Sequence, residues 1–165
     1  MCAGRGHDLL GVVPTHARRD DVTSVLVEID PVNAGVAREG AARAGLTRFQ
    51  VIEADAALTD VYAPYLPADI ALACGIFGNI SDADLERTVR GVSMLGRTGM
   101  AVVWTRHRLD PDLTPTIRRW FRESGFQESS FDALETENRY AIGVARLVGD
   151  PAPFTAGLRL FAFTR

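Results

Sequence analysis

The sequence contains no lysine, because all 18 of its basic residues are arginine. A P-loop needs a lysine on the phosphates, and Schiff-base or pyridoxal-phosphate chemistry needs a lysine amine, so these mechanisms are excluded. The net charge of −3 gives no broad attraction for a phosphate backbone. Apolar runs are also short, since none approaches the roughly 18 residues of a membrane span. We therefore expect no nucleic-acid partner and no membrane partner.

Cysteine and histidine are scarce as well. Cys2 and Cys74 have no paired spacing, and His7, His16 and His107 are scattered along the chain without a metal-ligand motif. The sequence therefore predicts no metal site. It favours a cytoplasmic protein whose thiols are reduced.

The length and composition suit one packed domain. The chain has 165 residues, of which 47% are hydrophobic, so we expect a single domain over residues 1–165. Periodicity and capping residues predict helices over 8–13, 30–44, 82–94 and 113–124. They predict strands over 22–29, 49–53, 69–74 and 100–104, and two or three closing strands within 126–134, 140–148 and 158–164.

This order of elements indicates an α/β fold. Strands alternate with helices over the first 125 residues, which predicts a doubly wound, Rossmann-like and mostly parallel sheet. The strand-rich end predicts an antiparallel C-terminal edge.

A glycine-rich turn opens the chain, with Gly4 and Gly6 among its first residues. Glycine lets a backbone turn sharply and approach a ligand closely, and such turns between a strand and a helix bind nucleotide-like ligands. No strand precedes this turn in the sequence. We therefore expect that the first central strand is largely missing, that the gene product extends upstream, and that the 165-residue chain alone is unstable or impaired in cofactor binding.

The turn resembles that of the class I S-adenosylmethionine-dependent methyltransferases. In that family the first strand ends in an acidic residue and runs into an acidic-x-G-x-G-x-G loop. Here Cys2, Gly4 and Gly6 occupy the three glycine positions, with cysteine as a small substitute. The resemblance implies that S-adenosyl-L-methionine is the cofactor and that Cys2, Ala3, Gly4 and Gly6 form its methionine-binding turn.

Two carboxylates agree with this family. Glu28, followed by Ile29, matches the acidic residue at the end of the second strand, which binds the ribose hydroxyls. It lies about 20 residues beyond the turn, as nucleotide-binding βαβ units require. Asp55 matches the aspartate that accepts from the adenine amino group, and the backbone amide of Ala56 would contact the ring.

The segment 71–80 resembles the family's strand and loop beside the sulfonium and the substrate. Ligands bind at the carboxyl ends of such strands. The resemblance implies that Cys74, Gly75, Ile76 and Phe77 line the cofactor, and that Phe77 and Asn79 border the substrate.

Two other functions remain open at this stage. A nicotinamide-dependent oxidoreductase shares the strand, the turn and the ribose carboxylate, but its G-x-G-x-x-G fingerprint would need glycine where Leu9 stands. A non-catalytic nucleotide-binding or interaction domain of the same fold is the second alternative, because each matching residue alone is more typical of an ordinary turn or a solvated strand end.

The acceptor is expected to be a small molecule. Methyltransferases that act on bases or glutamine carry Asn/Asp-Pro-Pro-Tyr/Phe after the fourth strand, and residues 73–77 lack that motif. Arg106 or His107, just after a strand, is a hypothetical ligand for an anionic substrate, with a plain polar loop as the alternative. His107 is the candidate base for an acceptor that must lose a proton.

Overall fold

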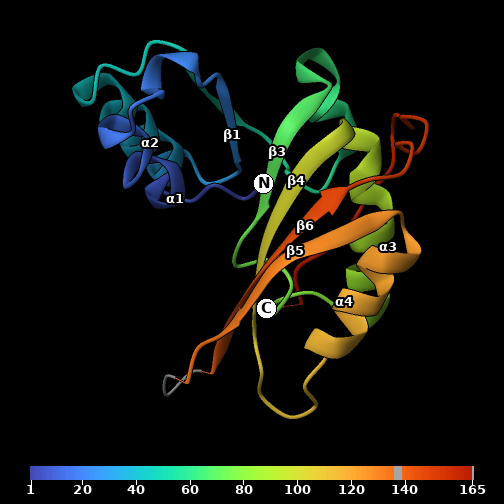
Figure 1. Cartoon of the computed structure of the whole chain (residues 1–165). Coiled ribbons are helices and arrows are strands. Elements are labelled where there is room, and N and C mark those ends of the chain that lie inside the picture. Colours follow the sequence, from blue (N-terminus) through green and yellow to red (C-terminus); the bar gives the residue numbers. More distant parts are fainter. Residues whose placement is uncertain (136–138, 165) are drawn as a thin grey trace. The chain divides into compact units, whose positions relative to one another are not determined.

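A computed structural model describes residues 1–135 and 139–164 (Figure 1). The chain divides into two compact units, Met1–Ala56 and Ala57–Arg165, and each is described by itself. Among the residues described, no helix combines the length and the apolarity that a membrane crossing requires.

Unit 1 contains a parallel pair of strands, β1 (Ser24–Glu28) and β2 (Phe49–Glu53), whose register ends with Glu28 opposite Glu53. Helix α2 (Pro31–Arg43) connects them. The Asp30 side chain caps this helix by accepting from the Asn33 amide at 2.9 Å. The helix terminates just before Gly45, which takes the left-handed conformation at φ +66°. The predicted helix over 30–44 is therefore confirmed.

The first helix is shorter than predicted. Helix α1 (His7–Leu10) has 4 residues, whereas the apolar pattern had suggested 8–13. Pro14 instead lies in a 3-10 turn over Val13–Thr15. Proline has no amide hydrogen to donate and disfavours a helical residue before it, so the α-helix cannot run through this position.

Unit 2 contains a four-stranded sheet in the order β3-β4-β6-β5. The strands are β3 (Ala68–Ala73), β4 (Gly96–His107), β5 (Phe126–Ala133) and β6 (Tyr140–Leu147). β3 and β4 are parallel, whereas β6 is antiparallel to both β4 and β5. The mixed α/β architecture with an antiparallel C-terminal edge is thus confirmed.

Two helices, α3 (Asp82–Gly91) and α4 (Thr114–Glu123), pack against each other in unit 2 (Figure 1). A 3-10 turn over Val92–Leu95 follows α3, so the α-helix ends earlier than the predicted 94. An aromatic cluster fills the core of this unit. Trp104 stacks on Phe77 and on Phe121, each at 6.0 Å between ring centroids, and Phe77 and Phe121 lie 6.5 Å apart. All three residues are at most 3% exposed.

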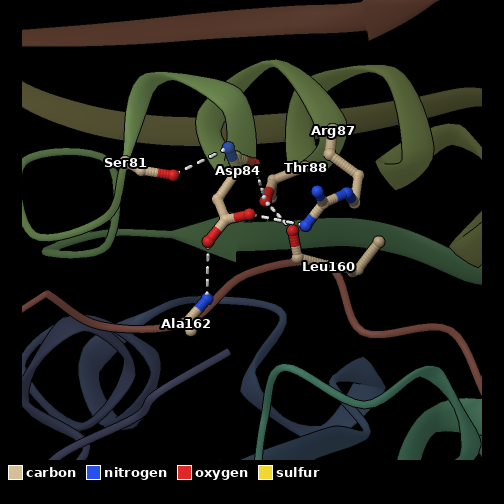
Figure 2. A network of polar contacts seen from close by, with 6 residues as sticks. All are labelled: Ser81, Asp84, Arg87, Thr88, Leu160 and Ala162. Carbon is tan, nitrogen blue, oxygen red and sulfur yellow. Dashed lines mark hydrogen bonds and ion pairs between the residues drawn. The ribbon is translucent and has the colours of Figure 1, made fainter.

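The segment 158–164 does not form the third closing strand that the sequence allowed. It makes only isolated antiparallel bridges, between Leu58 and Arg159 and between Ile80 and Phe163. Side chains of α3 hold it instead (Figure 2). The Asp84 carboxylate accepts from the Ala162 amide at 3.0 Å, and the Thr88 hydroxyl donates to the Leu160 carbonyl at 3.1 Å.

Candidate functional site

The glycine turn of unit 1, residues 2–6, lies directly against the end of β1. The Ala3 amide donates to the Val27 carbonyl at 2.9 Å, and the Gly4 amide donates to Glu28 Oε2 at 2.7 Å. Gly4 has φ +54°, and a Cβ built at this position would meet nothing within 4 Å. The turn therefore leaves open space beside Gly4, where a ligand can approach the backbone closely.

Gly6 has a different role, because it is needed for packing. It has φ +76°, and a Cβ there would lie 2.9 Å from Leu26 Cδ2 and 3.2 Å from Leu10 Cδ1. A side chain at Gly6 would push α1 away from β1. Both glycines of the turn take a backbone conformation that favours glycine, and Gly6 is needed in addition for close packing.

Glu28 is the carboxylate that the turn surrounds. It is only 8% exposed, and its second oxygen, Oε1, accepts from the Asp30 amide at 2.9 Å. Each carboxylate oxygen has two acceptor positions, so one on each oxygen remains for another donor. This pair of free acceptor positions suits the two neighbouring hydroxyls of a ribose.

Cys2, Glu28 and Asp55 form one electrostatic group in unit 1. The pKa of the Cys2 thiol is raised to about 11, mainly by burial; the N-terminal amine lowers it, whereas the charges of Glu28 and Asp55 contribute to the rise. Cys2 also has φ +48°, a conformation that favours glycine. Cys2 stands at the position where the resemblance led us to expect the first glycine of the turn. Asp55 is half-buried, and Ala56 beside it is 4% exposed. Ile29, the predicted site residue that follows Glu28, is 69% exposed.

In unit 2, the parallel pairing of β3 and β4 brings two segments to the same edge of the sheet. Ala73 lies opposite Trp104, so the β3 loop (residues 74–79) begins beside the last residues of β4. The Thr105 hydroxyl accepts from the Gly75 amide at 3.0 Å. Thr105 was not among the residues predicted from the sequence, where a hydroxyl residue near the end of a strand was the only available signal.

Asn79 closes the β3 loop on itself. Its side-chain Nδ2 donates to the Gly75 carbonyl at 2.8 Å, and its own carbonyl accepts from the Thr164 amide at 2.9 Å. Gly75 has φ +72° and open space at its Cβ position, as Gly4 has in unit 1. Cys74, directly after β3, is half-buried. Asn79 itself is exposed, so its amide is both fixed and accessible.

Phe77 is placed differently from the sequence-based expectation. Its ring is 1% exposed and packs within the aromatic cluster, and the neighbouring Ile76 is fully buried. Both side chains therefore belong to the core of unit 2 rather than to a ligand-facing surface. The Phe77 carbonyl, however, accepts a hydrogen bond from Arg106 Nη1.

Arg106 and His107 are the last residues of β4, which is longer than the predicted strand over 100–104. The expectation that both residues lie just after the strand was wrong, because pairing with β6 continues to the pair His107–Tyr140. Arg106 is 8% exposed, and this burial lowers the pKa of its guanidinium. His107 is half-buried, and its Nδ1 has no hydrogen-bond partner among the described residues.

His107 also limits the β3 loop sterically. A Cβ at Gly78 would lie 2.9 Å from His107 Cδ2 and 3.2 Å from Nε2. The imidazole therefore packs directly on the loop backbone. No group of three or more His, Cys, Asp or Glu that could hold a metal ion occurs within the described ranges 1–135 and 139–164.

The fold of this chain is found in solved methyltransferase structures. An O-methyltransferase family protein from Burkholderia thailandensis superposes with a TM-score of 0.69 at 16% identity, over 88% of this chain and 48% of its own. The S-adenosylmethionine-dependent methyltransferase SibL superposes with a TM-score of 0.63 at 17% identity, over 88% and 48% of the two chains. The predicted resemblance to class I methyltransferases is thus confirmed for the fold.

The same fold also occurs in a protein with a different named activity. The [4+2]-cyclase SpnF superposes with a TM-score of 0.62 at 17% identity, over 87% of this chain and 72% of its own. No protein-family model matches the sequence. No curated protein sequence matches it significantly either. The chain spans about half the length of the two methyltransferase structures, and these likenesses establish its fold.

Proposed function

We propose that this chain is the cofactor-binding part of an S-adenosylmethionine-dependent methyltransferase that acts on a small-molecule acceptor. The observation that carries the proposal is the contact between the glycine turn and Glu28, whose Oε2 accepts from the Gly4 amide at 2.7 Å. It joins two residues that lie 24 positions apart and that matched the family independently. The shared fold supports the same family.

The residues of unit 1 fit this cofactor chemically. Glu28 keeps free acceptor positions for the ribose hydroxyls, and Gly4 leaves open space beside the turn. The carboxylates of Glu28 and Asp55 create a negative potential at Cys2, which also favours a ligand with a sulfonium charge. The bound cofactor would supply a methyl group already activated by that charge. Cys2, Gly4, Glu28 and Asp55 would hold and orient it.

The main task of the protein is then positioning. Transfer from a sulfonium is an in-line displacement, so the acceptor atom must approach along a fixed direction. In unit 2 the β3 loop is held by Thr105 and by the side chain of Asn79. We propose that Asn79 borders the acceptor. His107 is the candidate to remove a proton where the acceptor atom carries one.

Binding of the cofactor can be tested by calorimetric titration of the full-length protein with S-adenosylmethionine and S-adenosylhomocysteine. Glu28→Gln removes the negative charge of the carboxylate that would accept hydrogen bonds from the ribose hydroxyls. Because hydrogen bonds to charged groups contribute roughly 1.5–3 kcal/mol, we expect about tenfold to hundredfold weaker binding. Glu53→Gln is the matched control. Glu53 lies opposite Glu28 in the register but is exposed and paired with Arg38, so its loss should leave the affinity unchanged.

The same titration separates the alternatives. Tight binding of a nicotinamide cofactor, or of neither ligand, would contradict the proposal. Because the cyclase SpnF has the same fold, binding alone does not establish methyl transfer. A second assay must therefore follow the labelled methyl group of S-adenosylmethionine into a panel of small acceptors. Binding without transfer to any acceptor would favour the non-catalytic alternative.

A further inference from the structure

Arg106 is the buried cation of unit 2. Of the charged residues that the structure describes, only Glu28 and Arg106 are buried, each with 8% exposed. Glu28 has a backbone amide on each of its oxygens. The charged guanidinium of Arg106 has fewer hydrogen-bond partners.

A guanidinium has five N–H donors, and Arg106 uses few of them within the protein. Its Nη1 donates to the Phe77 carbonyl, and its buried Nε has no acceptor among residues 1–135 and 139–164. Within the same residues no carboxylate forms an ion pair with it, although most other arginines on the surface of the chain have such a partner. A buried charge without a counter-charge is costly to hold.

Two acidic residues act on Arg106 only at longer range. The charges of Asp82 and Asp112 raise its pKa, but burial, which lowers it, is the larger effect. Asp112 is already engaged at the start of α4, because its Oδ1 accepts from the amide and the hydroxyl of Thr114 at 2.9 and 2.7 Å. Neither aspartate therefore supplies the missing direct partner.

Unpartnered donors and acceptors continue along the next two residues. His107 Nδ1 and Arg108 Nε are also buried without a hydrogen-bond partner in the described part of the chain. Arg108 makes its own ion pair through Nη2, with Glu135 at 2.6 Å. The carboxyl end of β4 thus gathers unsatisfied polar atoms beside the β3 loop, where ligands of such sheets bind.

We propose that Arg106 is an anion-binding residue and that its ligand is the carboxylate of a small molecule. The planar guanidinium matches a carboxylate with two parallel hydrogen bonds. A doubly charged phosphate suits the position less well, because Asp82 and Asp112 lie near enough to oppose a second negative charge. All the residues that form the anion site belong to unit 2. Only its further identification with the methyl acceptor, which would then be a carboxylic acid, rests on the proposed function.

Trp104 supplies a direct signal for the test. It lies two residues before Arg106 on the same strand and stacks on Phe77, whose carbonyl Arg106 contacts. The chain has 2 tryptophans, so Trp120→Phe in the full-length protein leaves Trp104 as the single reporter. The probes are acetate and benzoate, compared with chloride and inorganic phosphate at constant ionic strength. We expect a saturable fluorescence change with the carboxylates and a weaker response to the other anions.

Arg106→Gln separates anion binding from a structural role. Glutamine keeps a neutral N–H donor for the Phe77 carbonyl but has no charge, so we expect roughly tenfold to hundredfold weaker carboxylate binding in a folded protein. Arg146→Gln is the matched control. Arg146 also donates to a carbonyl, that of Gly99 at 2.7 Å, but it is exposed, and its loss should leave carboxylate binding unchanged.

Several outcomes would overturn the proposal. These are the absence of a saturable response in the parent protein, equal binding by Arg106→Gln, and preferential binding of phosphate. If the glutamine variant does not fold, Arg106→Lys keeps the charge without the planar fork and is expected to bind carboxylates about tenfold more weakly. Unchanged binding by that variant would also overturn it. A parallel titration with S-adenosylmethionine keeps the two proposals apart, because Arg106→Gln should not alter cofactor affinity.

Discussion

Gly143 is the position at which the packing of unit 2 can be tested most sharply. It lies on β6 opposite Trp104 of β4. A Cβ at this position would overlap the six-membered part of the indole and its Nε1, so the absent side chain is what lets the ring lie flat on the neighbouring strand. The substitution Gly143→Ala adds one methyl group to this contact.

The expected cost follows from the surroundings of the ring. Trp104 is 2% exposed and stacks or tilts against Phe77, Phe121 and Phe131 at 6.0 Å between centroids. Overpacking a filled core costs about 1–3 kcal/mol. Displacing the ring from one aromatic partner adds roughly 0.5–1.5 kcal/mol. We therefore expect Gly143→Ala to lower the free energy of unfolding by about 2–4 kcal/mol.

Urea unfolding followed by tryptophan fluorescence measures this change, and near-ultraviolet circular dichroism reports the displaced indole. Gly35→Ala in α2 serves as a control of opposite sign. A Cβ at Gly35 would meet nothing within 4 Å. Alanine should then stabilise the helix by about 0.5–1 kcal/mol. The reasoning would be refuted if Gly143→Ala unfolded at the same urea concentration as the parent protein with an unchanged near-ultraviolet spectrum.

The parts of the fold that follow from local chemistry were predictable from the sequence. Asp30, Pro31 and Gly45 determine α2 through a cap, a preset φ and a left-handed stop, and all three act within one helix. The extension of β4 to His107 was not predictable. Its last residues are polar and charged, and only their pairing with β6 makes them a strand.

The candidate site likewise has residues whose position the sequence could predict and residues whose position it could not. The sequence assigned Gly4 and Glu28 to one cofactor site because both resembled the same family at a suitable spacing. The structure joins them by a hydrogen bond, and their roles toward a cofactor stay a prediction. Phe77 was misplaced because its burial depends on Trp104 and Phe121, which are distant in the sequence. Position along a motif therefore predicted which backbone lies at the sheet edge, but not which side chains face the core.

Two further experiments test single contacts. Asp84→Ala removes the acceptor of the Ala162 amide (Figure 2). Because Ala162 is exposed and water can replace the acceptor, the free energy of unfolding should fall by about 0.5–1.5 kcal/mol, the net contribution of one hydrogen bond, and the urea midpoint should fall accordingly. An unchanged midpoint would contradict the anchoring of the C-terminal segment. The second concerns Cys2, because its pKa is raised from the ordinary 9.0 to about 11, mainly by burial and further by Glu28. An acid with a raised pKa is deprotonated only at higher pH. At about pH 8 the reactive thiolate should therefore be roughly a hundredfold scarcer than for an ordinary thiol. In a Cys74→Ser variant, the rate of alkylation by iodoacetamide should keep rising about tenfold per pH unit through pH 10. Glu28→Gln removes one of the charges that hold the proton on the thiol, so it should shift this profile to lower pH. A plateau near the ordinary pKa, unaffected by Glu28→Gln, would show that the thiol lies neither in a buried position nor in the field of the carboxylates.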